Sequence, residues 1–163
     1  MASKKLNSMR FLEKHKIDYT PREFDDSIHS AEGVAEALNM PFKHIYKTLV
    51  VLPDDKSTKP RPYLVLLSAG RQLDLKALAR VINIKKVRMA THAEAEKLTK
   101  LKVGGISPLA LTAKNWDVYI DERVLELDWL LLSAGQRGTN LQVNRADLMQ
   151  VLKMHIVSCS TEV

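Results

Sequence analysis

The chain has little of what a disulfide framework, a membrane span or a metal centre needs. Among its 163 residues is one cysteine, Cys159, which has no second cysteine to pair with, so an internal disulfide is excluded. The five histidines show no metal-ligand spacing, and no metal is predicted. The apolar runs, such as 49–52 and 64–67, fall far short of the about 20 residues of a membrane span. No apolar core follows the first five residues, so no secretion signal is predicted and a cytoplasmic location is expected.

What the chain does have is an uneven distribution of charge. Its net charge is +6, and residues 76–102 alone carry eight Lys or Arg and two Glu residues, so the rest of the chain is balanced. A concentrated basic segment suits a polyanion such as RNA. The alternative is the solvated face of two helices, and charge alone does not decide between them. The residues expected to contact RNA are Lys85, Lys86, Arg88, Lys100 and Lys102.

Hydrophobic periodicity and capping residues predict interleaved helices and strands. Helices are expected over 3–16, 31–38, 75–82, 92–99 and 145–152, and strands over 19–24, 46–52, 63–68, 87–89, 116–120, 129–133 and 140–143. At 163 residues, this order predicts one α/β or α+β domain over 1–163 with a mixed sheet. Residues 53–62 are expected to form an exposed loop. Residues 153–163 are expected to be a C-terminal tail, where a thiol would lack the rigid support that a nucleophile needs.

The stretch Gly104-Gly105-Ile106-Ser107-Pro108 interrupts an aliphatic and basic run. Glycine permits positive φ and close approach of a ligand to the main chain, while proline fixes φ and removes a donor. Such a loop can present backbone N–H groups to an anion or to a polarised carbonyl. The alternative is a tight connection between a helix and a strand.

Two side chains stand out by their position in predicted strands. Lys47 shares a strand face with Leu49 and Val51, which is costly for a lysine unless it snorkels from the strand start or reaches a cavity. Ser133 ends a strand just before a glycine turn, so its hydroxyl faces either a pocket or a structural partner. No Gly-x-Ser-x-Gly elbow surrounds Ser133, which disfavours a serine hydrolase.

The sequence Leu-Leu-Ser-Ala-Gly occurs twice, at 66–70 and at 131–135. Both copies are predicted strand ends that run into a glycine turn. Their spacing is too long for a solenoid repeat. They indicate one strand-to-turn arrangement used twice, at neighbouring strand ends.

Six segments of the chain form an ordered series: 45–51 (IYKTLVV), 72–78 (QLDLKAL), 86–90 (KVRMA), 94–99 (EAEKLT), 103–109 (VGGISPL) and 133–138 (SAGQRG). Their order and spacing resemble the YbaK family of free-standing aminoacyl-tRNA deacylases, which are related to the editing domain of bacterial prolyl-tRNA synthetases. Each motif is weakly specific by itself. Six in this order, over about residues 5–152, are highly specific.

The resemblance implies a mixed, barrel-like sheet flanked by helices, and hydrolysis in trans of mischarged tRNA, with Cys-tRNA(Pro) as the characteristic substrate. It assigns Lys47 as the essential lysine, Gly104 and Pro108 as the Gly-x-x-x-Pro loop, and Ser133 as a pocket serine. The residues expected to bind substrate are Phe24, Tyr46, Thr48, Gly105, Ile106, Ser107, Ser133, Gly135 and Asn140. It also implies that the substrate's own thiol attacks the ester, so no cofactor, metal or catalytic cysteine is expected. Lys47 would orient the ester or the terminal ribose, and N–H groups of the Gly104 loop would stabilise the oxyanion.

The chain departs from the family pattern at three positions. Phe24 stands where relatives often have tyrosine, Asn140 where many have aspartate, and Ala110 where many have glycine. The lysine and glycine elements are intact, but these changes leave the identity of the amino acid open. The expected partners are tRNA(Pro) and prolyl-tRNA synthetase. The alternatives are a deacylase of alanyl-tRNA(Pro) or another small aminoacyl-tRNA, and a non-catalytic module that binds charged tRNA or the synthetase.

Overall fold

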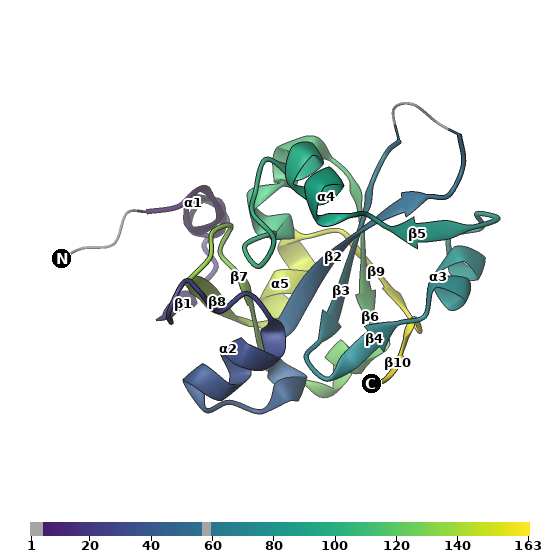
Figure 1. Cartoon of the computed structure of the whole chain (residues 1–163). Coiled ribbons are helices and arrows are strands. Elements are labelled where there is room, and N and C mark those ends of the chain that lie inside the picture. The colour runs from purple at the N-terminus through teal and green to yellow at the C-terminus, as the bar shows by residue number, and fades with distance from the viewer. Residues whose placement is uncertain (1–4, 57–59) are drawn as a thin grey trace.

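Four of the five α-helices in the described residues begin where the sequence offers a side-chain oxygen to cap them. The computed structural model describes residues 5–56 and 60–163, and its helices are α1 (Asn7–Lys14), α2 (Ala31–Leu38), α3 (Leu75–Val81), α4 (His92–Thr99) and α5 (Arg145–Val151) (Figure 1). Four have the predicted N-cap, whose side chain accepts a hydrogen bond from the backbone N–H three residues on: Ser30, Asp74, Thr91 and Asn144. The four predicted helix starts at these caps are therefore confirmed.

The first helix is shorter than predicted at both ends. Its N-cap position is Leu6, which has no side-chain oxygen to satisfy the first N–H groups. The chain leaves the helix before Lys16, whose φ of 59° lies in the left-handed region. The start predicted at residue 3 lies outside the described residues.

Within the described residues, the strands form three sheets. The strands are β1 (Tyr19–Glu23), β2 (Tyr46–Pro53), β3 (Tyr63–Ser68), β4 (Arg71–Leu73), β5 (Val87–Met89), β6 (Asp117–Asp121), β7 (Trp129–Ser133), β8 (Thr139–Asn144), β9 (Met154–Val157) and β10 (Ser160–Glu162). Their orders are β1-β8-β7, β10-β4 and β5-β2-β3-β6-β9. The last of these is mixed, because β3, β6 and β9 run parallel while β2 is antiparallel to both of its neighbours. The predicted mixed sheet flanked by helices is confirmed, although it is divided into separate sheets.

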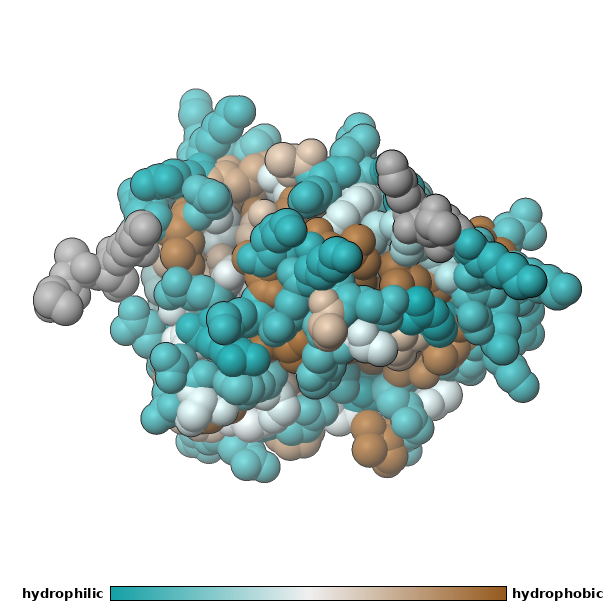
Figure 2. Space-filling view, turned by 45° about the horizontal axis from the view of Figure 1, so that its top comes forward, coloured by the Kyte–Doolittle hydropathy of each residue, from teal (hydrophilic) through white to brown (hydrophobic). Residues whose placement is uncertain are grey.

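Alternation along the central strands separates two parts of the core. Val50, Leu64 and Leu66 face a large cluster that also contains residues of α1, α5 and β7, whereas Val51 and Val65 face a smaller cluster covered by α3. A third cluster places Val34, Ala35, Ile45, Ala69 and Leu131 together, so α2 packs where β2 begins and where β3 and β7 lie nearby. The face shown in Figure 2 is mostly hydrophilic, with hydrophobic residues visible between the polar side chains.

The repeated Leu-Leu-Ser-Ala-Gly segments meet at Ile45, just before β2. The Ala69 N–H donates to the Ile45 carbonyl at 2.7 Å, and Ile45 forms a parallel bridge with Leu131. The two segments therefore lie on either side of one residue, which confirms that they end at neighbouring positions. This bridge joins the sheet of β7 to the sheet of β2.

The C-terminal tail predicted for 153–163 is wrong. Residues Met154–Val157 form β9, which pairs in parallel with β6, and Ser160–Glu162 form β10, which pairs with β4. Between them Cys159 is buried, with 1% of its surface exposed. Burial, together with the charges of Asp121, Asp74 and Glu122, raises the pKa of its thiol to about 12. The thiol is thus unsuited to nucleophilic attack because it is buried and protonated, and not because it lies in a tail.

Among residues 5–56 and 60–163, no helix combines the length and the apolar character needed to cross a bilayer.

Candidate active site

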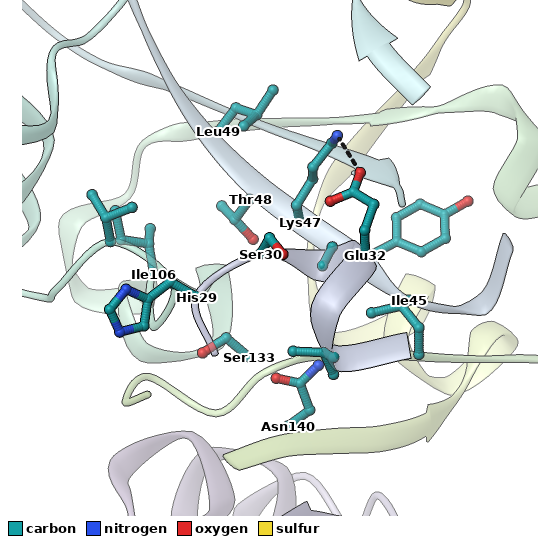
Figure 3. Close-up of a pocket in the computed structure, with 15 residues that line it drawn as sticks. His29, Ser30, Glu32, Ile45, Lys47, Thr48, Leu49, Ile106, Ser133 and Asn140 are labelled. Carbon is teal, nitrogen blue, oxygen red and sulfur yellow. Dashed lines mark hydrogen bonds and ion pairs between the residues drawn. The ribbon is translucent and has the colours of Figure 1, made fainter. Parts of the chain in front are cut away.

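A pocket of about 200 Å³ lies where four segments that are distant in sequence meet (Figure 3). These segments are the start of α2, the first half of β2, the glycine loop, and the paired ends of β7 and β8. The lining residues are His29, Ser30, Ala31, Glu32, Val34, Ile45, Tyr46, Lys47, Thr48, Leu49, Val103, Gly104, Ile106, Ser133 and Asn140. The structure thus brings together Lys47, Gly104 and Ser133, whereas Pro108, the fourth residue that the sequence resemblance singles out, does not line the pocket.

Lys47 reaches the edge of this pocket and is held there by two acceptors. Its ammonium donates to the Arg71 carbonyl oxygen at 2.6 Å and pairs with Glu32 Oε1 at 3.4 Å. In Figure 3 the Lys47 side chain extends toward Glu32. The side chain of Lys47 is 25% exposed. A lysine on an apolar strand face is accommodated here because its ammonium group reaches the edge of a cavity.

Glu32 is kept ionised by its surroundings. Partial burial by itself would raise the pKa of its carboxyl, but hydrogen bonds from the Gly70 N–H and from its own backbone N–H, together with the Lys47 ammonium, outweigh burial and leave the pKa below its usual value. The Gly70 N–H donates to Glu32 Oε1 at 3.0 Å. The same carboxylate oxygen therefore joins α2, the turn after β3, and Lys47.

The pocket also borders an open edge of β2. Strand β5 pairs with β2 only from Val51 onward, and no other strand of the described residues pairs with 46–49 on that side. The Ala90 N–H donates to the Val50 carbonyl, so Val50 points its backbone groups toward that edge. Because alternate residues point their N–H and C=O groups to the same edge, those of Thr48 face the open edge as well. The Thr48 hydroxyl is buried and has no hydrogen-bond partner in the described part of the chain.

Ser133 and Asn140 face each other across a strand pair. They are directly opposite in the β7–β8 register and are both buried, with 7% and 4% of their surfaces exposed. The Ser133 Oγ accepts a hydrogen bond from the Gly135 N–H at 3.1 Å. The Ser133 hydroxyl therefore keeps a proton to donate toward the pocket, and the Asn140 amide supplies a second neutral polar group.

The glycine loop contributes to the pocket only in part. Gly104, with φ of +92°, lines it beside Ile106, and a Cβ at Gly104 would lie 3.0 Å from the His29 Cα. Gly105 faces away, and its N–H donates to the Lys102 carbonyl at 2.8 Å. An oxyanion role for the Gly105 N–H is therefore excluded in this conformation. Ser107 and Pro108 are buried where they begin a 3₁₀ turn, Pro108–Ala110, so they shape the loop from outside the pocket.

The remaining residues predicted to bind substrate lie in different parts of the structure, and only some of them line the pocket. Tyr46 lines the pocket, but its ring belongs to the large core cluster, and burial together with the Asp121 charge raises the pKa of its phenol. Phe24 packs against the α2 cluster instead of the pocket. Gly135, with φ of +106°, lines a neighbouring groove. Among the described residues, no group of three or more His, Cys, Asp or Glu side chains is arranged to hold a metal ion.

Comparison with known proteins assigns the chain to a family. The model of the family described as "Aminoacyl-tRNA editing domain" matches residues 25–151, a range that contains every residue lining the pocket. The chain belongs to the aminoacyl-tRNA editing family. The predicted resemblance to YbaK-type deacylases is thereby confirmed, and the protein is an aminoacyl-tRNA deacylase.

Members of the editing family similar to this chain include free-standing proteins and parts of synthetases. A protein of Enterococcus faecalis, EbsC, named as a candidate Cys-tRNA(Pro)/Cys-tRNA(Cys) deacylase, is 34% identical over 142 residues, which cover 85% of this chain and 83% of EbsC. A proline–tRNA ligase of Sulfurihydrogenibium is 34% identical over 119 residues, which cover 73% of this chain but 19% of the ligase. This editing domain therefore spans about a fifth of the length of that ligase.

Solved structures show the same fold. The crystal structure of a candidate trans-editing enzyme for prolyl-tRNA synthetase superposes with a TM-score of 0.75 at 22% identity, covering 98% of this chain and 99% of that one. A hypothetical protein, APE2540, gives a TM-score of 0.84 at 19% identity, covering 95% and 99%. These two similarities establish the shared architecture of the editing domain.

The five predicted RNA-contacting residues do not form one surface. Lys85 and Lys86 lie beside α3, and Lys86 pairs with Asp54 at 3.3 Å. Arg88 is held by both carboxylate oxygens of Glu94, at 2.7 and 2.8 Å. Lys100 and Lys102 instead line a groove next to the active-site pocket. Figure 1 shows α3 and β5 at the opposite side of the molecule from α2, β7 and β8.

Among the pocket-lining residues that the sequence analysis did not single out are two titratable side chains, Glu32 and His29. Glu32 and His29 lie in a polar segment around the start of α2, where a carboxylate in the first turn is a common surface feature. The available signal was the predicted cap at Ser30, which places both residues within two positions of a helix start. Nothing local in the sequence shows that this helix start packs against β2.

Proposed function

We propose that the pocket hydrolyses the ester of a small mischarged aminoacyl-tRNA, with cysteine on tRNA(Pro) as the preferred substrate. The observation that carries this proposal is the convergence of Lys47, Thr48, Ser133 and Asn140 on a cavity of about 200 Å³. A cavity of this size has room for a small aminoacyl group such as cysteine, alanine or proline. The similarity to EbsC supports cysteine, since that relative is named for cysteinyl-tRNA.

A separate editing site is needed because the selectivity of a synthetase for similar amino acids is physically limited. Cysteine and proline are similar in bulk, and a difference of about one methylene gives only about 1–3 kcal/mol of discrimination. Some tRNA(Pro) is therefore charged with cysteine, and a second site must remove the error. Such a reaction takes place where tRNA is charged, so the proposal places the protein in the cytoplasm, with prolyl-tRNA synthetase as a partner.

The chemistry asks the protein mainly for orientation and electrostatic stabilisation, because an aminoacyl ester is already reactive. In the proposed reaction the substrate thiol gives its proton to solvent, and its sulfur bonds to the ester carbon. The bond from that carbon to the ribose oxygen then breaks, and the ribose oxygen takes up a proton. Water afterwards opens the cyclic thioester to release cysteine. Neither step requires a nucleophile from the chain.

We assign the roles of the chain as follows. The Lys47 ammonium orients the ester or the terminal ribose, and backbone N–H groups of Thr48 and Gly104 stabilise the developing oxyanion. The hydroxyl of Ser133 and the amide of Asn140 hold the aminoacyl group. Phe24, Gly105, Ser107, Pro108 and Gly135 shape the surrounding loops without lining the pocket.

The test is an assay panel with tRNA(Pro) charged separately with cysteine, alanine or proline. We expect the wild type to hydrolyse the cysteinyl ester, and Lys47→Ala to lower kcat/KM by about 10²–10³, as removal of one transition-state donor does elsewhere. Glu36→Gln, on the exposed side of α2, is the matched control and should act as wild type. Lysine-dependent loss of the alanyl ester alone would replace cysteine by alanine. Loss of no ester, with or without the synthetase, would leave a binding module.

A further inference from the structure

We propose that a second groove beside the pocket binds the phosphates of the single-stranded 3′ end of tRNA. This basic groove has a volume of about 570 Å³ and is lined by Asp26, Ser27, His29, Lys100, Leu101, Lys102, Gly135, Gln136 and Arg137. The proposal rests on the proposed function, because it follows the polynucleotide that is attached to the ester in the pocket.

The basic groove and the pocket share a wall. His29 lines both cavities, and its ring nitrogen Nε2 is fixed by a 3.0 Å contact with the Asp26 carbonyl oxygen. On the other side, the Arg137 Nε donates to the carbonyl oxygen of Val103, a pocket residue, at 2.7 Å. A ribose held at the pocket mouth therefore has the basic groove next to it, where the preceding phosphates must pass.

The two lysines of the basic groove are available to bind an anion. Lys100 and Lys102 are exposed, and neither forms an ion pair within the described residues. The groove has one carboxylate, Asp26, against these two lysines and Arg137. By contrast, Lys86 and Arg88 on the α3 side already have carboxylate partners. Phosphate contacts supply most of the sequence-independent affinity of a protein for nucleic acid.

Local backbone geometry explains how the two lysines come to stand together. Helix α4 ends at Thr99, and the next residue, Lys100, is left-handed at φ 62° and donates its N–H to the Glu96 carbonyl. The chain then turns back, and Glu96 Oε2 accepts the Val103 N–H at 2.8 Å. The segment between these two anchors presents Lys100 and Lys102 beside the turn after β7.

Two double variants with the same loss of charge separate the basic groove from general electrostatic attraction. The first is Lys100→Gln with Lys102→Gln, and the control is Lys85→Gln with Lys86→Gln on the α3 side. We expect the groove variant to raise KM for cysteinyl-tRNA(Pro) by about tenfold with kcat unchanged. The slope of log affinity against log salt should fall by about 1.4, since each single-strand phosphate contact contributes about 0.7. The control should change both quantities much less.

A minimal substrate without phosphates separates an effect on the basic groove from an effect on the pocket. Cysteinyl-adenosine carries the ester but no phosphate, so the groove variant should hydrolyse it at the wild-type rate. Equal effects of both double variants on KM, or no effect of either, would overturn the assignment of the basic groove. A slower rate on cysteinyl-adenosine would also overturn it, because the lysines would then act on the pocket itself. If the wild type hydrolyses neither substrate, the proposed function fails, and binding of uncharged tRNA(Pro) by the same two variants still tests the basic groove.

Discussion

The Lys47 ammonium donates a 2.6 Å hydrogen bond to the carbonyl oxygen of Arg71. The Arg71 guanidinium in turn binds the last strand, with Nε donating to the Ser160 Oγ at 3.1 Å and Nη2 donating to the Ser160 carbonyl at 3.0 Å. Because β10 pairs with β4 over Arg71–Leu73, the C-terminal residues hold the segment that supplies an acceptor to Lys47. The lysine assigned to the ester is thus supported by residues more than a hundred positions away.

Glu32 is expected to be a positioning residue for Lys47. Glu32→Gln removes the negative charge that pairs with the ammonium at 3.4 Å, so we expect kcat to fall by about tenfold while KM for tRNA changes little. Steady-state kinetics on cysteinyl-tRNA(Pro) measure both, with Glu36→Gln as the control on the same helix. Glu32→Asp, which keeps the charge on a shorter side chain, should recover part of the lost kcat. Equal kcat values for Glu32→Gln and Glu36→Gln would contradict this role.

Removal of the last strand should affect both stability and turnover. Deletion of 160–163 breaks the two Arg71–Ser160 hydrogen bonds and the β4–β10 pairing, so we expect a lower Tm and a lower kcat. The milder Ser160→Ala removes one hydrogen bond and should cost about 0.5–1.5 kcal/mol of unfolding free energy. Thermal melts and kinetics on the same samples test the link. A deletion variant that folds and turns over substrate at the wild-type rate would disprove it.

Gly105 is expected to tolerate no side chain. A Cβ there would lie 2.8 Å from the Gln136 carbonyl carbon and 2.9 Å from the Arg137 nitrogen, and both are backbone atoms. Gly105→Ala should therefore lower the free energy of unfolding by about 1–3 kcal/mol, as overpacking does in other cores. The midpoint of urea unfolding provides the measurement. An unchanged midpoint would show that the glycine loop moves away from the β7–β8 turn at little cost.

The ionised Glu94 carboxyl group should make the stability of the folded protein depend on pH. Its pKa is lowered to about 2, first by the Arg88 hydrogen bonds and then by the Thr91 N–H. A carboxyl group whose pKa is lower in the folded than in the unfolded protein stabilises the fold at pH values above its unfolded pKa of about 4.3. This stabilisation is lost as the pH falls through the pKa of the folded protein. We expect the Tm difference between wild type and Glu94→Gln to be largest near neutral pH and to shrink between about pH 4 and pH 2. A Tm difference that stays constant across this range would contradict the assignment.

Cys159 should resist thiol reagents in the folded protein. Only 1% of the surface of this residue is exposed, and burial raises the pKa of its thiol to about 12, so little thiolate forms at neutral pH. Labelling by a disulfide reagent should be slow in buffer and fast in concentrated urea. Rapid labelling under native conditions would mean that β9 and β10 detach readily from the sheet.

The sequence predicted most elements correctly because their signals are local. Asp74, Thr91 and Asn144 cap helices through hydrogen bonds to residues three positions on, so the pattern and the contact lie together in the chain. The short β4 has no such signal, since three residues show no periodicity and their partner comes from the C-terminus. For the same reason the C-terminal strands were mistaken for a tail.

The candidate active site combines residues that local sequence patterns identify with residues that they do not. Lys47, Gly104 and Ser133 were identifiable from motifs in order, and the structure brings them into one pocket. Glu32 and His29 were not, because their importance depends on where α2 packs. The basic segment 76–102 is continuous in the sequence, but its lysines lie on two separate surfaces of the fold. Lys85 and Lys86 lie beside α3, whereas Lys100 and Lys102 line the basic groove.

Local sequence patterns were sufficient to predict the helix caps, the strands with regular alternation, the family and the lysine on an apolar strand face. These features depend on residues within a few positions of one another or on motifs in linear order. The folded chain was needed to show that β10 supports Arg71, that Glu32 holds Lys47, and that Lys100 and Lys102 line a groove beside the pocket. Such contacts depend on how distant segments close onto one another through backbone pairing and burial, and no local pattern records that closure.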